Sequence, residues 1–142
     1  MRSKAEIIHQ WYKDIWIGGD LDKVEQMYCP VPDEDALVPG ALTSIEETRE
    51  MVVVLANLVG EMQVRVIHSI EQDDWVSAQL EVSGCKQGTD VPVSLRWLTM
   101  VRFEDGRIVE SYPSVNFLSF FEQLGQLPAD SFELLLSGTV LR

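Results

Sequence analysis

The hydrophobic residues of this 142-residue chain change their spacing near residue 61, and this change constrains the fold more than any other feature. Upstream, apolar side chains recur every three or four residues, as on one face of an α-helix. Downstream, apolar and polar residues alternate, as in strands that bury one face of a sheet. A run of helices followed by a run of strands predicts an α+β domain.

The first part of the chain predicts three helices. Residues 3–18 carry a broad apolar face, and Gly18 and Gly19 end this helix. Asp20 is the expected N-cap of a second, shorter helix. Ser44 and Glu47 form a capping box for a third helix, which Gly60 is expected to end.

The second part predicts four consecutive antiparallel strands between residues 61 and 115, joined by hairpins such as Asp105-Gly106. A curved sheet wrapped around the third helix leaves a cone-shaped cavity at its wide end. Two short helices, in "FLSFFEQLG" and "PADSFELLLSG", close the chain. We expect a single domain over residues 1–125, with residues 126–142 as a C-terminal helical extension of it.

The amino-acid composition limits the classes of molecule that this chain is expected to bind and the compartment in which it is expected to lie. Lys plus Arg total 11 against 23 Asp plus Glu, and the resulting net charge of −12 disfavours nucleic acid and anionic membranes. Cys29 and Cys85 lie far apart in the sequence and belong to no metal-binding or redox motif. We therefore expect buried or free thiols, which fit a reducing compartment. The N-terminus has acids and a helical period, and no stretch reaches the ~18 apolar residues of a membrane span. The expected location is the cytoplasm.

Several residues are candidates for a site in the cavity. His68 shares the strand parity of Val64 and Val66, so it would be a titratable base among apolar walls, or else a core or edge histidine. Arg96 would hold a ligand carboxylate if it points inward, and would pair with an acid such as Glu81 if it points outward.

Aromatic residues supply further candidates. Tyr28 and Tyr112 are expected either to donate a hydrogen bond into the pocket or to pack as ordinary aromatics. Trp11, Trp16 and Trp97 have the spacing of core residues and are also suited to wall an apolar pocket. No metal site is expected, because the acidic loop 33–35 has no His or Cys beside it. No cofactor is expected either, because the chain has no glycine-rich phosphate loop.

The segments "WIGGDLDKVEQMYCP" and "VRFEDGRIVESYPSVNFLSFFEQLG" resemble the SnoaL-like polyketide cyclases of the nuclear transport factor two-like superfamily. The resemblance runs from about Ile7 to Gly125 and is most specific from Val101 onward. It implies a cone-shaped α+β barrel with an apolar pocket, assembled as a homodimer through the sheet.

The resemblance also implies which positions of this chain correspond to the catalytic residues of the cyclases. In these cyclases the strand after the Asp-Gly turn reads roughly Glu-His-Trp-Asp, and its Asp is the general acid/base. Here Glu110 matches the Glu and Tyr112 replaces the Trp, while Ser111, Pro113 and Asn116 stand at the His, the catalytic Asp and a second Asp. Proline carries no proton, so general acid–base catalysis from this position is lost.

Three functions therefore remain open. The first is a pocket protein that binds a small, largely apolar molecule, with Ser111 and Pro113 in the pocket wall. The second is an isomerase, cyclase or hydrolase whose acid/base role has moved to His68, with Tyr112, Asn116 or Arg96 polarising the substrate. The third is a homodimeric interaction module with a vestigial cavity.

Overall fold

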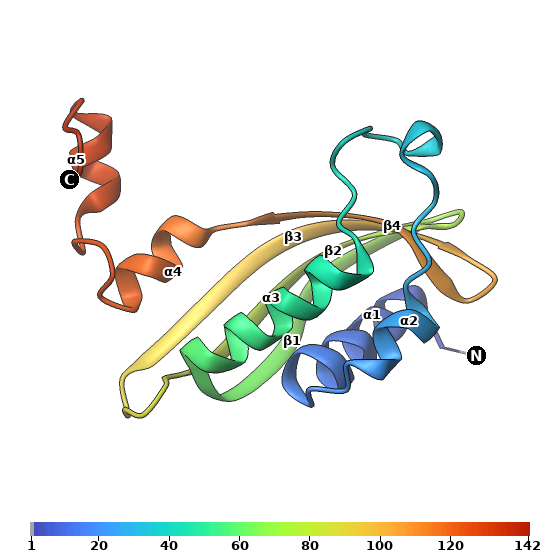
Figure 1. Cartoon of the computed structure of the whole chain (residues 1–142), viewed down its shortest axis with the longest axis horizontal. Helices are drawn as coiled ribbons and strands as arrows, with labels where there is room; N and C mark the ends of the chain where they lie inside the picture. Colours follow the sequence, from blue (N-terminus) through green and yellow to red (C-terminus); the bar gives the residue numbers. More distant parts are fainter. Residues whose placement is uncertain (1) are drawn as a thin grey trace.

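The computed structural model describes residues 2–142. Three α-helices and two shorter helical turns, one of them the 3₁₀ turn η2 (Asp33–Asp35), precede a four-stranded antiparallel sheet, and two short helices follow it. Helices α1 (Lys4–Trp11), α2 (Asp22–Met27) and α3 (Ile45–Leu58) all lie on one face of the curved sheet (Figure 1). The predicted α+β architecture is confirmed.

The helix boundaries follow local capping. Ser3 accepts a hydrogen bond from the Glu6 N–H at 3.1 Å and begins α1, which continues without a break into the π-helical turn η1 (Tyr12–Ile17). Ser44 accepts from the Glu47 N–H at 3.0 Å, so the predicted start of α3 is confirmed. The expected cap at Asp20 is wrong, because the residue before α2 is Leu21 and no side chain caps that helix.

The sheet consists of β1 (Val59–Gln72), β2 (Trp75–Lys86), β3 (Pro92–Glu104) and β4 (Arg107–Val115), in the order β1-β2-β3-β4. The hairpin turns require left-handed backbone: φ is 53° at Asp73 and at Asp105, and 78° at Gly106. Because β1 and β4 are the edge strands, β4 presents a free edge along part of its length.

A bulge in β1 changes which of its side chains face the helices. Val66 pairs with Leu80, but His68 pairs with Gln79, so Ile67 is an extra residue in the ladder. The insertion reverses the alternation, and Ile70 is 75% exposed instead of buried. The predicted common parity of Val64, Val66, His68 and Ile70 therefore holds only up to the bulge.

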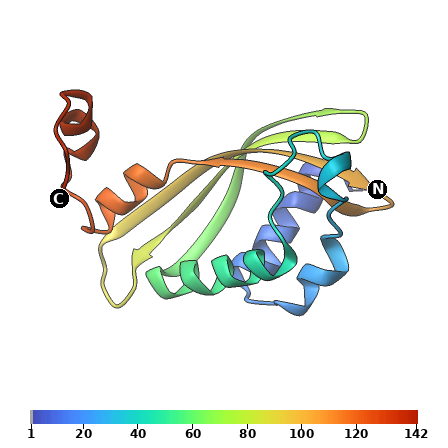
Figure 2. The ribbon, with the colours of Figure 1, turned by 45° about the horizontal axis from the view of Figure 1, so that its top comes forward.

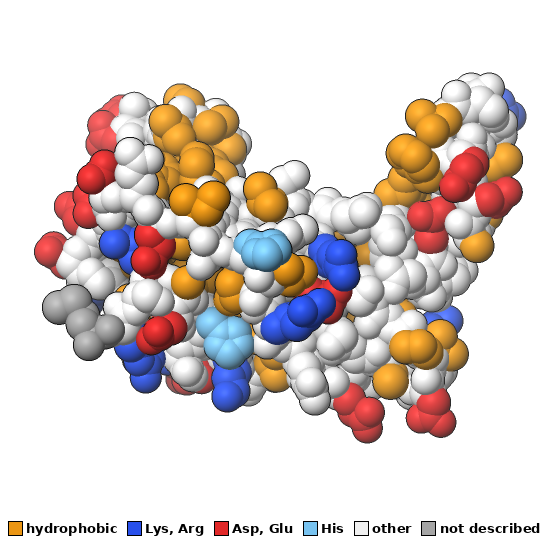
Figure 3. All heavy atoms as spheres, turned by 180° about the vertical axis from the view of Figure 1, so that it is seen from behind, with side chains coloured by type: hydrophobic (Ala, Val, Ile, Leu, Met, Phe, Trp, Pro, Cys, Tyr) orange, Lys and Arg blue, Asp and Glu red, His pale blue; other side chains and the backbone are white. Residues whose placement is uncertain are grey.

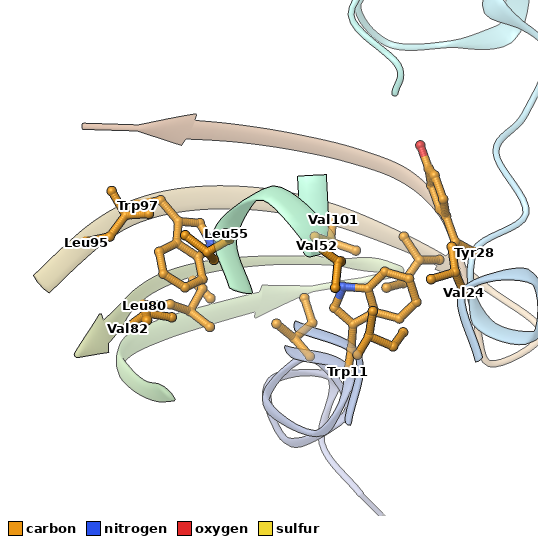
Figure 4. Close-up of a cluster of buried hydrophobic side chains, with 14 of the residues drawn as sticks. Trp11, Val24, Tyr28, Val52, Leu55, Leu80, Val82, Leu95, Trp97 and Val101 are labelled. Carbon is orange, nitrogen blue, oxygen red and sulfur yellow. The ribbon is translucent and has the colours of Figure 1, made fainter. Parts of the chain in front are cut away.

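The core lies between the sheet and the helices. Figure 4 shows Trp11 from the first helix, Val52 and Leu55 from α3, and Trp97 from β3 within one buried cluster. On the other side of α3, Val53 and Val54 are about half exposed, at 47% and 50%. Helix α3 is thus covered on one side only.

The chain ends in α4 (Phe117–Gln123) and α5 (Ser131–Leu136). Helix α4 is anchored by Phe120, which is 2% exposed. Helix α5 stands apart from the body of the domain, on the side of the sheet opposite the other helices (Figure 2). Within residues 2–142, no helix is long and apolar enough to cross a membrane.

Candidate functional site

A cavity of about 280 Å³ lies between the N-terminal helices, α3 and the concave face of the sheet. Its lining comes from α1, η1 and α3, from β2, β3 and β4, from the start of α4, and from the segment between α2 and α3. The lining residues are Trp11, Tyr12, Trp16, Tyr28, Thr43, Thr48, Met51, Leu55, Val82, Leu95, Trp97, Ile108, Ser111, Pro113, Val115 and Phe117.

The inner wall is aromatic and contains one polar pair. The Trp97 indole N–H donates to the Tyr12 hydroxyl at 3.2 Å, and the two rings meet edge to face with centroids 5.0 Å apart. Burial raises the pKa of Tyr12 to about 12, although hydrogen bonding from Trp97 and Thr99 acts against the rise. The Thr99 oxygen makes no hydrogen bond of standard geometry to the described residues, so we assign Trp97 as the partner of Tyr12.

The segment between α2 and α3 closes another side of the cavity. The Tyr28 hydroxyl donates to the Thr43 carbonyl at 2.5 Å, which ties the two ends of this segment together. Burial raises the pKa of Tyr28 to about 12, with smaller contributions from Tyr112 and Glu47. Both cavity tyrosines are therefore neutral hydrogen-bond donors at pH 7.

Strand β4 places Ser111 and Pro113 in the cavity wall. Pro113 is exposed at the rim and lies directly across from Thr99 on β3. A proline is compatible with this strand because β4 is an edge strand, where a missing N–H costs no ladder hydrogen bond on the open side. The edge position of β4 thus explains how a strand with several polar residues accommodates a proline.

Tyr112 does not face the cavity, which corrects one sequence prediction. Side chains alternate along a strand, so Tyr112 lies on the opposite, outer face of the sheet from Ser111 and Pro113. There it stacks on Trp75 with ring centroids 6.4 Å apart. Its hydroxyl donates to Glu110 Oε2 at 2.5 Å and accepts from the Val38 N–H at 3.2 Å.

Glu110 is the centre of a buried polar network on this outer face. The side chain is 3% exposed, and its oxygens accept from Arg102 Nε at 2.6 Å and from the Leu37 N–H at 2.9 Å, besides Tyr112. Burial alone would raise the pKa of Glu110. The hydrogen bonds from its three partners and the positive charge of Arg102 outweigh burial and hold that pKa below its usual value.

Three more candidates lie outside the cavity. His68 is exposed beyond the Ile67 bulge, on the outer face. Arg96 also points outward and binds Glu81 Oε2 at 2.7 Å. Asn116 accepts from the Ser119 N–H at 3.2 Å and caps α4. Figure 3, which views the molecule from behind, shows histidine side chains and basic side chains (lysine or arginine) close together on the surface.

The predicted catalytic group of His68, Tyr112 and Asn116 is therefore wrong as a cluster around the cavity, and the inward alternative for Arg96 is wrong as well. The structure does place the other candidates on the cavity, namely Trp11, Trp16, Tyr28, Trp97, Ser111 and Pro113. Their contact with a ligand stays a prediction.

Sequence reasoning missed Tyr12, the residue with the most distinctive environment in the cavity. Its position between Trp11 and Trp16 on the aromatic face of the first helix was the available signal. Among residues 2–142, no group of three or more His, Cys, Asp or Glu side chains could hold a metal ion.

The chain folds as a curved antiparallel sheet packed against a layer of helices, with an apolar cavity between the two. This arrangement is typical of the nuclear transport factor two and ketosteroid isomerase-like class of fold. Solved structures support this assignment. TsrD from Streptomyces laurentii superposes with a TM-score of 0.67 at 18% identity, covering 89% of this chain and 100% of that one. IdmH from Streptomyces antibioticus gives 0.68 at 22% identity, covering 87% and 99%.

A third structure, from Catenulispora acidiphila, has a ketosteroid isomerase-like fold and was solved in complex with trimethylamine. It matches with a TM-score of 0.66 at 18% identity, covering 90% of this chain and 98% of that one. No curated protein matches the sequence. The SnoaL-like polyketide cyclase family matches residues 6–124, and the chain belongs to this family.

Proposed function

We propose that this protein binds a small, uncharged and largely apolar molecule in the cavity between its helices and its sheet. The observation that carries this proposal is the chemistry of the lining. Among the described residues that line the cavity, none is Asp, Glu, His, Lys or Arg. A charged ligand would lose its hydration there without gaining an ion pair.

The size of the cavity indicates a ligand of about two fused rings. A cavity of about 150 Å³ accommodates benzene, and this one measures about 280 Å³. Aromatic side chains on several sides favour a planar molecule. The protonated Tyr12 hydroxyl offers a hydrogen bond to one ligand oxygen.

An enzyme with relocated acid/base chemistry receives no support from this geometry. A general base must reach the proton that it removes and must be unprotonated near neutral pH. The titratable groups on the cavity are Tyr12 and Tyr28, both with a pKa of about 12. His68 lies on the other face of the sheet, and Pro113 has no proton to exchange.

An interaction module with a vestigial cavity is also less well supported, because the protein's own side chains leave this cavity open. Ligand binding and self-association are compatible, however, and a homodimer remains a proposal that the outer face of the sheet supports.

The test compares 2-naphthol with 2-naphthoate by saturation-transfer NMR at pH 7. The two molecules share the same rings, but the second is an anion. We expect transfer to 2-naphthol in the sub-millimolar range of affinity and at least about tenfold weaker binding of 2-naphthoate, since an unpaired charge is costly to bury.

Two variants of the same strand show where the probe binds. Ser111→Phe fills the cavity wall and should abolish the signal. Ser114→Phe adds the same ring to an exposed residue on the other face of β4 and should leave it unchanged. Equal binding of 2-naphthol to wild type and to Ser111→Phe, or no binding to wild type, would refute the proposed site.

A further inference from the structure

The cavity has two ends whose polar groups differ. Helix α3 runs along it, and Thr48 and Leu55, both in the lining, are seven residues or about 10 Å apart on that helix. Figure 4 shows Leu55 and Trp97 at one end of the buried cluster and Tyr28 at the other. We call these the Trp97 end and the Tyr28 end of the cavity.

The Trp97 end offers hydrogen-bond donors. The Tyr12 hydroxyl already accepts from the Trp97 indole N–H at 3.2 Å, and its own proton has no acceptor of standard geometry among the described residues. The Trp16 ring lies next to the Tyr12 ring, with centroids 5.9 Å apart, and the Trp16 indole nitrogen is buried without a partner in the described chain. An indole N–H can only donate. This end of the cavity therefore favours an acceptor atom of the ligand.

The Tyr28 end offers acceptors. The Tyr28 hydroxyl donates to the Thr43 carbonyl at 2.5 Å, and the Thr48 hydroxyl donates to the neighbouring carbonyl of Ser44 at 3.0 Å. A hydroxyl has one proton, so both groups have only lone pairs left for a ligand. Tyr28 and Thr48 are buried, at 3% and 8% exposed, and both line the cavity. Ser111 can donate or accept, so it imposes no direction.

We propose that the ligand is a planar molecule with a hydrogen-bond acceptor at one end and a donor at the opposite end. The acceptor binds the Tyr12 hydroxyl, and the donor binds the lone pairs of Tyr28 and Thr48. This inference rests on the proposed function, because it assigns the orientation of a ligand in the same cavity. A molecule without the donor would leave lone pairs unpaired at the Tyr28 end, and burial of an unpaired polar group is unfavourable.

Three probes test the polarity of the ligand. In 6-methoxy-2-naphthol an acceptor oxygen and an O–H donor stand at opposite ends of the rings. The isomer 3-methoxy-2-naphthol has both groups at one end, and 2-methoxynaphthalene has no donor. In competition with 2-naphthol, measured by saturation-transfer NMR at pH 7, 6-methoxy-2-naphthol should bind the wild type about three- to tenfold more tightly than either of the others, as one additional neutral hydrogen bond allows.

Two substitutions that preserve shape locate the donor site. Thr48→Val and Tyr28→Phe each remove one hydroxyl, and the Ser44 carbonyl keeps the Thr48 N–H as a partner at 3.0 Å. Each variant should reduce the ratio between the dissociation constants of 2-methoxynaphthalene and 6-methoxy-2-naphthol, and the double variant should bring that ratio to about one. Thr139→Val makes the same exchange at an exposed residue outside the cavity and should leave the ratio as in the wild type.

The outcomes separate this inference from the proposed function. If 2-naphthol and all three probes fail to bind the wild type, both are overturned. If 2-naphthol binds but 6-methoxy-2-naphthol has no advantage over 2-methoxynaphthalene or over its isomer, only the assigned polarity is overturned. An advantage that persists unchanged in Thr48→Val and in Tyr28→Phe overturns it as well, and this result does not depend on the folding of the double variant.

Discussion

Replacing Glu110 by Gln tests whether the buried network on the outer face stabilises the domain. The substitution keeps the size of the side chain and removes its charge. Glu110 accepts hydrogen bonds from Arg102, Tyr112 and the Leu37 N–H, at 2.5 to 2.9 Å. A glutamine has one acceptor oxygen, and its amide group would face donors.

The expected cost is about 2–3 kcal/mol in the free energy of unfolding. A hydrogen bond to a charged group contributes about 1.5–3 kcal/mol, and removal of one partner from a fully buried ion pair costs about 3–5 kcal/mol. The value here falls below that upper range because the Arg102 side chain is 22% exposed and keeps Glu104 as a partner at 3.4 Å. For a domain of this size the loss corresponds to about 6–10 °C in melting temperature.

Urea unfolding at pH 7 measures the difference. Glu104→Gln is the control: it removes the other carboxylate that contacts Arg102, but that side chain is 61% exposed, so the change should cost less than about 0.5 kcal/mol. Hydrogen exchange at the Leu37 amide should also become faster in Glu110→Gln. A destabilisation equal to that of Glu104→Gln would refute the assignment of Glu110 as a stabilising centre.

Three further predictions follow from the same geometry. Because its hydrogen bonds and the charge of Arg102 hold the pKa of Glu110 below its ordinary value of 4.5 in the folded state, its contribution to the free energy of unfolding is complete above that pH and is lost as the pH falls through the lowered pKa. The free energies of unfolding of wild type and Glu110→Gln, measured in urea, should therefore converge in acid and differ by a constant amount between about pH 6 and 8. Tyr12→Phe removes the acceptor of the Trp97 N–H and should lower the free energy of unfolding by about 1–2 kcal/mol. It should also weaken 2-naphthol binding several-fold and leave naphthalene binding unchanged. Equal effects on the binding of both probes would contradict the role of the Tyr12 hydroxyl. Pro113→Asp should titrate within about one unit of an ordinary carboxyl, near 4, because the position is exposed at the rim; a carbon-13 NMR titration with a pKa above about 6 would show that the residue is buried.

Local signals in the sequence were sufficient for most of the fold. The capping box at Ser44 and Glu47 marks the start of α3 because a side-chain oxygen there satisfies a free backbone N–H of the first turn. The alternation along β2 and β3 identifies their buried sides, since a strand with one buried face must repeat every two residues.

The site is harder to predict because one inserted residue turns the side chains that follow it in β1 to the other face of the sheet. Strand parity counted across the inserted Ile67 predicts His68 on the cavity side, whereas its side chain lies on the outer face. Tyr112 is hard to place for a different reason. The resemblance to the cyclase motif gives positions along a strand, but it does not say which of two neighbouring positions faces the cavity. The hydrogen bonds from the Val38 N–H to the Tyr112 hydroxyl and from the Leu37 N–H to Glu110 decide this, and they join segments more than 70 residues apart.

The central claim is that the cavity binds a neutral aromatic molecule, and the indole N–H signals of the four tryptophans test it most directly. Trp11, Trp16 and Trp97 line the cavity, whereas Trp75 stacks on Tyr112 outside it and serves as an internal reference. In a titration of the nitrogen-15-labelled protein with 2-naphthol, the three cavity signals should shift together with one saturating curve, while the Trp75 signal stays in place. Shifts at Trp75 alone, or no shift at any of the four, would contradict the account.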